Sequence, residues 1–524
     1  MTWRQQRVVV VGGGLAGLRL AQRLGSAPTT VTVSVFGEEP HVPYNRVLLA
    51  EILAGRYAAE VAALPSAGPG LRRGVRAVLI DRHARLVHGD DGSVEPYDVL
   101  VLATGSNPVL PPLRGLFEPG DGELPDGVHP FRTMDDCTAL SDAVGPGVRT
   151  VVIGGGLLGV SAARALAARG AQVVLAQQGE RLMERQLDAP ASALLRSHLT
   201  ELGVEVHTEC RVRAVLTDPP GSGPGRRDAR PAPAGPRRVT GVELADGYRL
   251  DADLVVLACG VRPRVGLARA AGLDVRQGVL VDDELRTSDP RIHAIGDCAE
   301  HGGRVYGLAG PALEQADVLA SILLSGPAAA GHPEARSASP AHAAPHAHAA
   351  SPAHAAPEAN EAPVPGPGQG AGAGHGRTAG APGTPGPDTA EAVHGAGAPV
   401  GAPGPDPGPD TGPATPAGAP LRYTGTRALT RLTLAHGPAG PAPLDLAAFG
   451  ETTPLPGDDV VRLTDATRRT YRQVVVRGDR LVGGVLLGEL SAVGTLARAW
   501  EGDEPLSATD RLIHLLTDDG GPTR

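Results

Sequence analysis

Runs of apolar residues alternate with amphipathic segments over the first 324 residues of the chain. The run Val8–Val11 leads into a glycine-rich turn and then into a segment whose apolar residues have helical spacing, and the same order recurs after Val151–Ile153. Continuous apolar runs of this length are typical of strands buried on both faces of a parallel sheet. The pattern therefore predicts an α/β fold that contains two βαβ units.

Composition changes sharply in the region 325–420, which consists almost entirely of Gly, Pro, Ala, Ser, Thr, His and acidic residues. A segment with so few large apolar side chains does not bury enough surface to offset the entropy cost of ordering, so we expect a disordered linker. The globular pattern returns over residues 421–524 and predicts a small α+β domain. An alternative role for the linker is weak metal binding by its repeated histidines, such as His342, His346, His348 and His354.

The formal net charge of −9 is spread along 524 residues, which gives no electrostatic footprint for nucleic acid. No stretch of about 18 consecutive apolar residues is present, so we expect no membrane span. The N-terminal residues lack the apolar stretch and cleavage site of a secretory signal, and we expect a cytoplasmic protein. The four cysteines lie far apart, which argues against a disulfide scaffold, a zinc or iron–sulfur site and a redox-active dithiol: Cys137, Cys210, Cys259 and Cys298.

The first glycine-rich turn has the G-x-G-x-x-G spacing, with Gly12, Gly14 and Gly17. In such a turn the first glycine permits a tight bend, the second lets the backbone approach a pyrophosphate, and the third allows the helix to pack closely on the strand. Glu38 follows the next predicted strand, about 20 residues after Gly17, where a carboxylate accepts hydrogen bonds from ribose hydroxyls. This turn therefore predicts a dinucleotide site.

The second turn repeats the spacing with Gly154, Gly156 and Gly159. Its following strand ends at Gln177, where a carboxylate would repel a 2′-phosphate and an arginine would attract one. Gln177 does neither, and the later Arg181 and Arg185 are as readily explained as solvated helix residues. The sequence therefore leaves both NADH and NADPH open.

Two further strand ends support the first site. Apolar runs lead into the segment Ala103-Thr104-Gly105 and into Gly296-Asp297. A short carboxylate at a strand end is able to bind a sugar-like chain of hydroxyls.

Taken together, these four segments resemble the flavoprotein reductases with two dinucleotide sites, in which the first unit binds FAD and the second binds NAD(P)H. More narrowly, VFGEEPHVPYNRVLLAEILAG, GGGLLG followed by RLMERQLD, and RVYGLAGPALEQA resemble the NAD(P)H- and FAD-binding part of assimilatory nitrite reductase. The segments DLAAFGE and DRLVGGVLLGEL resemble the C-terminal domain of those proteins and of rubredoxin reductases.

The resemblance implies two Rossmann-like dinucleotide-binding domains, each with three layers and a parallel sheet, and a small α+β C-terminal domain after the linker. The implied boundaries are 1–118 and 270–324 for the FAD-binding domain, 119–269 for the NAD(P)H-binding domain, 325–420 for the linker and 421–524 for the C-terminal domain.

The resemblance also implies individual contacts. Glu38 would bind the FAD ribose, Arg46 the FAD phosphates or adenosine, and Val78 the adenine. Asp297 would bind the ribityl chain, and the helix that begins near Pro311 would point at the flavin pyrimidine. The expected cofactor-binding residues are Gly12, Gly14, Gly17, Glu38, Arg46, Val78, Ala103, Thr104, Gly105, Gly296, Asp297, Pro311, Ala312, Gly154, Gly156, Gly159, Gln177 and Gly260.

Three residues depart from the pattern of related ferredoxin reductases. Ala50 and Glu51 stand where those proteins carry Ser-Lys near the flavin, and Ser161 replaces a glutamate near the nicotinamide. No metal and no catalytic acid or base is expected, because the flavin carries the chemistry.

Three functions are therefore open. In the first, electrons pass from NAD(P)H through FAD to a separate nitrite reductase or iron–sulfur component in nitrogen assimilation. The second is a rubredoxin- or ferredoxin-type reductase, and the third is a flavin-bound interaction or regulatory module with little turnover. A homodimer is possible in each.

Overall fold

The computed structural model describes residues 6–27, 31–66, 68, 70–117, 122–218, 237–325, 421–435, 442–503, 505–506 and 516. The expected linker lies outside these residues except for Ser325, and so do its histidines. None of the helices in the described part of the chain is both long and apolar enough to cross a bilayer.

The first sheet has five parallel strands in the order β19-β7-β1-β2-β3. Val8 and Val10 belong to the core on one face, and Val9 and Val11 belong to the core on the other face, which confirms the buried valine strand. These strands are β1 (Gln6–Val11), β2 (Val31–Gly37), β3 (Leu71–Arg73), β7 (Val99–Leu102) and β19 (Ile292–Ala294).

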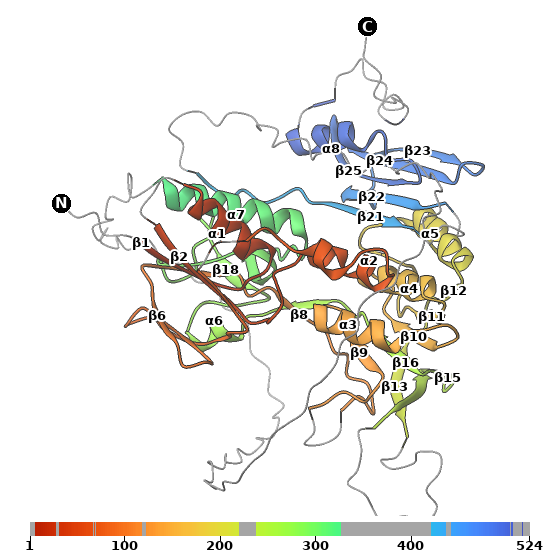
Figure 1. The fold of residues 1–524 in the computed structure, drawn as a ribbon. Helices are drawn as coiled ribbons and strands as arrows, with labels where there is room; N and C mark the ends of the chain where they lie inside the picture. Colours follow the sequence, from red (N-terminus) through yellow and green to blue (C-terminus); the bar gives the residue numbers. More distant parts are fainter. Residues whose placement is uncertain are drawn as a thin grey trace, which may run out of the picture. The chain divides into compact units, whose positions relative to one another are not determined.

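Helices cover one face of this sheet and a small antiparallel sheet covers the other (Figure 1). The helices are α1 (Leu15–Gly25) and α7 (Ala309–Leu324), which pack side by side. Arg19 and Arg23 of α1 each form an ion pair of 2.8 Å with Asp317 of α7. The small antiparallel sheet consists of β4 (Ala77–Asp81), β5 (Leu86–Gly89) and β6 (Val94–Pro96).

The second sheet repeats this plan, with five parallel strands in the order β12-β11-β10-β16-β9. Val152 packs on the helix side, whereas Val151 and Ile153 pack on the side of three antiparallel strands. The parallel strands are β9 (Val128–Pro130), β10 (Arg149–Ile153), β11 (Gln172–Ala176), β12 (Val204–His207) and β16 (Leu254–Leu257). The covering elements are α3 (Met134–Ala143), α4 (Leu157–Ala168) and α5 (Ala189–Glu201), and β13 (Val212–Thr217), β14 (Val239–Leu244) and β15 (Arg249–Asp251).

Two short antiparallel strands, β8 (Ser106–Pro108) and β17 (Val261–Pro263), join the two sheets where the chain leaves one and returns from the other. A parallel pair, β18 (Val279–Val281) and β20 (Ala299–His301), lies beyond them along the chain. The short helical elements are η1 (Arg46–Leu48), α2 (Leu49–Leu53), η2 (Ala59–Ala62), α6 (Gly266–Ala270) and η3 (Gly296–Cys298).

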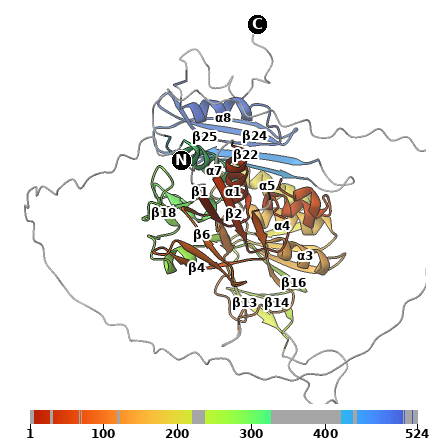
Figure 2. The same ribbon diagram turned by 60° about the vertical axis from the view of Figure 1, so that its left-hand side comes forward.

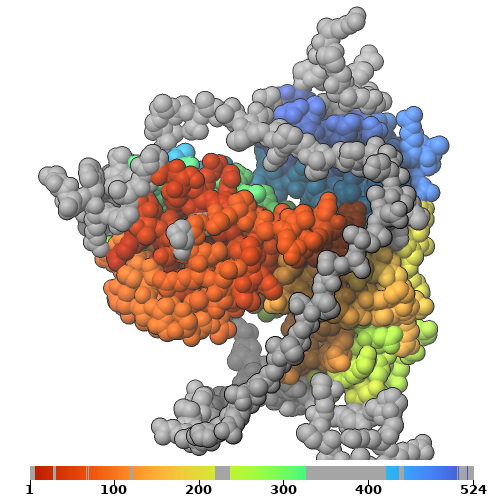
Figure 3. Space-filling view, viewed as in Figure 1, coloured from red at the N-terminus to blue at the C-terminus, as the bar shows by residue number. Residues whose placement is uncertain are grey.

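The C-terminal residues form an antiparallel sheet in the order β21-β22-β25-β24-β23, with helix α8 on it (Figure 2). In the space-filling view the blue residues of this region lie against the yellow residues of the second sheet's helices (Figure 3). Its elements are β21 (Leu429–Leu434), β22 (Leu444–Gly450), β23 (Asp459–Asp465), β24 (Thr470–Arg477), β25 (Arg480–Leu487) and α8 (Val493–Gly502). The expected fold class is confirmed, and the domain boundaries stay a prediction.

The closeness of α1 to the turn before it generates a first prediction. A Cβ at Gly17 would lie 2.0 Å from the carbonyl oxygen of Gly12, so we expect Gly17→Ala to lower the free energy of unfolding by about 1–3 kcal/mol. Urea unfolding followed by circular dichroism measures this. Gly25→Ala, at the end of the same helix with no atom within 4 Å of its Cβ, is the control and should stabilise by roughly 0.5–1 kcal/mol. Equal effects at both positions would contradict the close-packing account.

Candidate functional site

The first glycine turn connects β1 to α1 and leaves an open backbone surface. Gly12 has a φ of +125°, and a Cβ there would lie 2.0 Å from the Ala103 carbonyl oxygen, so only glycine fits. A Cβ at Gly14 would meet no atom within 4 Å, and α1 begins at the next residue. The first N–H groups of a helix have no partner within the helix, and its dipole is positive at this end. The turn therefore presents an open anion cradle.

The second turn, between β10 and α4, has the same construction. Gly154 has a φ of +110° with its Cβ direction closed by the Ala258 carbonyl oxygen at 2.5 Å. Gly156 is open, and α4 begins directly after it. The third glycines, Gly17 and Gly159, face inward, since a Cβ at Gly159 would lie only 1.7 Å from the Gly154 carbonyl oxygen. They allow each helix to sit on its turn.

Both turns open into one cleft of about 2260 Å³. Of the predicted site residues, Gly17, Gly159 and Pro311 do not line it, the first two because they pack helix against turn. The predicted residues that do line it are Gly12, Gly14, Glu38, Arg46, Val78, Ala103, Thr104, Gly105, Gly154, Gly156, Gln177, Gly260, Gly296, Asp297 and Ala312.

Carboxylates at the first site already have guanidinium partners. Glu38 follows β2 and forms an ion pair with Arg264 at 2.6 Å. Arg46 pairs with Glu39, which also accepts a hydrogen bond of 2.6 Å from the Tyr44 hydroxyl. A ribose bound here would share the Glu38 carboxylate with Arg264.

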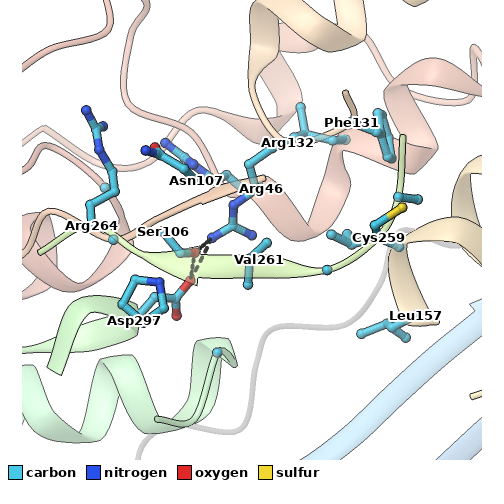
Figure 4. A pocket seen from close by; sticks show the side chains of 18 of the residues that line it. Arg46, Ser106, Asn107, Phe131, Arg132, Leu157, Cys259, Val261, Arg264 and Asp297 are labelled. Carbon is cyan, nitrogen blue, oxygen red and sulfur yellow. Dashed lines mark hydrogen bonds and ion pairs between the residues drawn. The ribbon is translucent and has the colours of Figure 1, made fainter. Parts of the chain in front are cut away.

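Asp297 is held across the junction of the two sheets (Figure 4). Its Oδ2 accepts hydrogen bonds from Arg132 Nη2 at 2.6 Å and from the Ser106 hydroxyl at 2.8 Å. Both bonds end on the same oxygen, and η3 carries this carboxylate on the cleft wall. The arrangement suits a group that binds a chain of hydroxyls.

Arg132 is a site residue that the sequence reasoning missed. A capping box between Thr133 and Asp136 starts α3, and Asp136 also accepts the backbone N–H of Arg132 at 2.9 Å. Burial lowers the pKa of Arg132 while Asp297 raises it, so the guanidinium depends on that carboxylate for its compensation. The local signal was an arginine directly before a T-x-x-D helix start.

Gln177 directly follows β11, and its Oε1 accepts a hydrogen bond of 2.8 Å from the backbone N–H of Gly155. The strand-end side chain thus braces the second glycine turn, and it brings no charge to that part of the cleft. At the first site, Gln315 of α7 likewise holds a glycine in place, because it accepts a hydrogen bond of 2.7 Å from the backbone N–H of Gly296. Ala309 and Ala312, in the first turn of α7, line the cleft.

Two thiols, Cys210 and Cys259, line the cleft, and all four cysteines are free. Burial raises the pKa of Cys259 to about 11, so its thiol stays protonated at neutral pH. Among the described residues no cluster of His, Cys, Asp or Glu has the arrangement of a metal site. The side chains present fit two dinucleotides with open phosphate cradles and carboxylates for hydroxyl groups.

The family described as pyridine nucleotide-disulphide oxidoreductase matches residues 6–316 of the chain. The chain is 34% identical over 331 residues to the assimilatory nitrate reductase electron transfer subunit of Bacillus subtilis, covering 62% of this chain and 40% of that protein. It is 35% identical over 323 residues to a nitrite reductase [NAD(P)H] of the same organism, covering 60% and 37%. It therefore spans less than half the length of these two relatives.

The match covers a larger share of shorter relatives and of solved structures. The ferredoxin–NAD(+) reductase component of the biphenyl dioxygenase system of Paraburkholderia xenovorans is 31% identical over 331 residues, which cover 61% of this chain and 75% of that protein. The crystal structure of a covalent putidaredoxin reductase–putidaredoxin complex has the same fold, with a TM-score of 0.67 at 21% identity. The match covers 99% of both chains.

The burial of Cys259 generates the second prediction. Because its pKa is about 11 instead of 9.0, its thiolate fraction at pH 7 is about a hundredfold below that of an ordinary thiol, and we expect alkylation by iodoacetamide to be slower by about that factor. Mass spectrometry of the native protein measures the rate at Cys259, and the urea-unfolded chain is the control. Alkylation of the native protein at the unfolded rate would place a reactive thiolate in the cleft.

Proposed function

The chain belongs to the pyridine nucleotide-disulphide oxidoreductase family, and from this premise we propose that it takes hydride from NADH or NADPH onto bound FAD and passes the electrons to a separate acceptor protein. The observation that carries the proposal is the pair of open glycine turns on one cleft. Dinucleotides bind α/β sheets at the carboxyl ends of the strands, where both turns lie. One cleft therefore has room and phosphate cradles for two such cofactors.

The first sheet holds FAD in this proposal. Gly12 and Gly14 would hold the pyrophosphate, and Glu38 would accept hydrogen bonds from the ribose hydroxyls. Asp297 accepts hydroxyl groups of the ribityl chain, with Arg132 fixing its position. Arg46 and Val78 lie along the wall where the phosphates and the adenine would rest.

The second sheet holds NAD(P)H. Gly154 and Gly156 receive its pyrophosphate, and Gln177 stands at the adenosine ribose. FAD bound in the first site would supply the redox chemistry, since a flavin is able to take hydride from a nicotinamide and give up electrons singly or in pairs. The N-terminus of α7 would favour negative charge on a flavin pyrimidine bound near it, because helix dipoles are positive at that end. All four cysteines are free, and burial raises the pKa of each thiol, so in this proposal the electrons pass to the acceptor without a protein disulfide.

The favoured acceptor is a nitrite reductase or iron–sulfur component in nitrogen assimilation, acting in the cytoplasm. Its support is the 34% identity with an assimilatory nitrate reductase electron transfer subunit. A rubredoxin- or ferredoxin-type acceptor is the alternative. Its support is the 31% identity with a ferredoxin–NAD(+) reductase component, and the fold, C-terminal sheet included, is that of a putidaredoxin reductase. A flavin-bound module with little turnover is the third.

Rapid mixing tests the proposal. Purified protein loaded with FAD is mixed anaerobically with NADH or NADPH, and we expect the flavin absorbance to bleach with at least one of them. Absence of bleaching with both would eliminate the reductase and leave the module. Reoxidation by purified nitrite reductase component, ferredoxin or rubredoxin then separates the two acceptor classes.

The end of β11 generates the third prediction. Gln177→Glu keeps an acceptor for the Gly155 N–H and adds a carboxylate, which repels a 2′-phosphate and accepts a ribose hydroxyl. We expect the ratio of the NADPH to the NADH dissociation constant to rise roughly tenfold or more, measured by fluorescence titration. Gln172→Glu, at the exposed opposite end of β11, is the matched control and should leave the ratio unchanged. An unchanged ratio in Gln177→Glu would show that the adenosine ribose does not bind at this strand end.

A further inference from the structure

One buried guanidinium connects three parts of the molecule. Arg164 lies two turns into α4, and its side chain is 1% exposed. Its Nη2 forms an ion pair with Glu51 of α2 at 2.7 Å. Its Nη1 donates a hydrogen bond of 2.8 Å to the carbonyl oxygen of Ala435, just after β21. The helix α2, which follows the first sheet's β2 along the chain and packs on α3 and α4, therefore meets α4 and the end of β21 at one side chain.

Of these two contacts, the one with Glu51 of α2 alone brings a negative charge to Arg164. Burial lowers the pKa of Arg164, and Glu51 raises it. Glu51 also pairs with Arg56 near its own helix, so one carboxylate serves two guanidinium groups. A buried charge of this kind is tolerated only with its partner, and removal of one partner is far more costly than removal of both.

The segment that Arg164 holds is an edge strand. β21 is the first strand of the C-terminal sheet order, so among the described strands it has a neighbour on one side alone. At its end, Leu434 offers its carbonyl oxygen to His198 of α5 at 3.1 Å, and Ala435 offers its own to Arg164. Two helices of the second sheet thus occupy hydrogen-bonding positions along this edge.

The same three elements form part of the cleft wall. Ala50 of α2, Ser161 of α4 and Arg431 of β21 line the cleft. Glu51 and Arg164 do not line the cleft. Glu51 is the residue after Ala50, and Arg164 lies about one helical turn after Ser161. The pair therefore lies directly behind the wall that it joins.

We propose that Arg164 is a positioning residue that sets how α2, α4 and β21 approach one another, and thereby the alignment of the two cofactor sites across the cleft. This inference rests on the proposed function. Hydride transfer requires the reacting atoms within about 3–3.5 Å, so a small shift of one wall costs rate without removing any phosphate contact. The expected signature is a loss of rate with retained nucleotide affinity.

The experiment compares the full-length protein with Arg164→Met and with the double variant Glu51→Leu/Arg164→Met. In Arg164→Met we expect the limiting rate of flavin reduction at saturating nucleotide to fall at least tenfold, while the dissociation constant of the nucleotide changes less than twofold. Hydrogen exchange of the peptide that contains β21 should accelerate at least tenfold. The double variant removes both buried charges, so its melting temperature should recover while the rate stays low.

Arg169→Met is the matched control. Arg169 caps the same helix and donates to the carbonyl oxygens of Leu53 and Ser141, each at 3.3 Å, without reaching β21. We expect it to leave the rate and the exchange of β21 within twofold of the unsubstituted protein.

Three results would overturn the inference. They are a normal rate in a folded Arg164→Met protein, a rate that recovers together with the melting temperature in the double variant, and a loss of nucleotide affinity as large as the loss of rate. If the unsubstituted protein is not reduced at all, the proposed function fails. The exchange measurement still decides in that case, because unchanged exchange of β21 in Arg164→Met shows that Arg164 does not hold the strand.

Discussion

The contact on which the rest of the structure depends is the one between each glycine turn and the helix that follows it. At Gly17 and Gly159 a methyl group would lie 2.0 and 1.7 Å from the carbonyl oxygens of Gly12 and Gly154. Without side chains at these positions each helix begins directly over the end of its strand. The free N–H groups of both helices then face the space beyond the sheets, and an anion site arises from backbone alone.

Because the proposed phosphate cradles are made of backbone, the proposal assigns specificity to a few charged side chains, and the structure pairs these with other side chains. Glu38 pairs with Arg264, and Asp297 pairs with Arg132. Each ion pair holds a carboxylate in place on the cleft wall. In the proposed function, a sugar hydroxyl that bound there would donate to an oriented acceptor, so little ordering entropy would be lost on binding.

The sequence predicts those strands and turns that are determined by residues close together along the chain. The valine run of β1 and the strand of β11 follow from apolar continuity, and the turn at Gly12 follows from spacing. The pairing of Arg132 with Asp297 joins residues 165 positions apart and depends on how two sheets meet, which no local pattern encodes. The capping box beside Arg132 marked the start of a helix, but it carried no information on the direction of the guanidinium.

The C-terminal sheet shows the same limit at a larger scale. Its antiparallel strands were expected as a small separate domain, and the family match ends at residue 316. In the structure Arg431 and Leu432 of β21 nevertheless line the cleft, and Ala435 bonds to a helix of the second sheet. The two nucleotide-binding units alone therefore do not enclose the cleft. β21, more than 100 residues after the end of α7, forms part of the cleft wall. The position of β21 therefore contributes to the geometry in which two cofactors would meet.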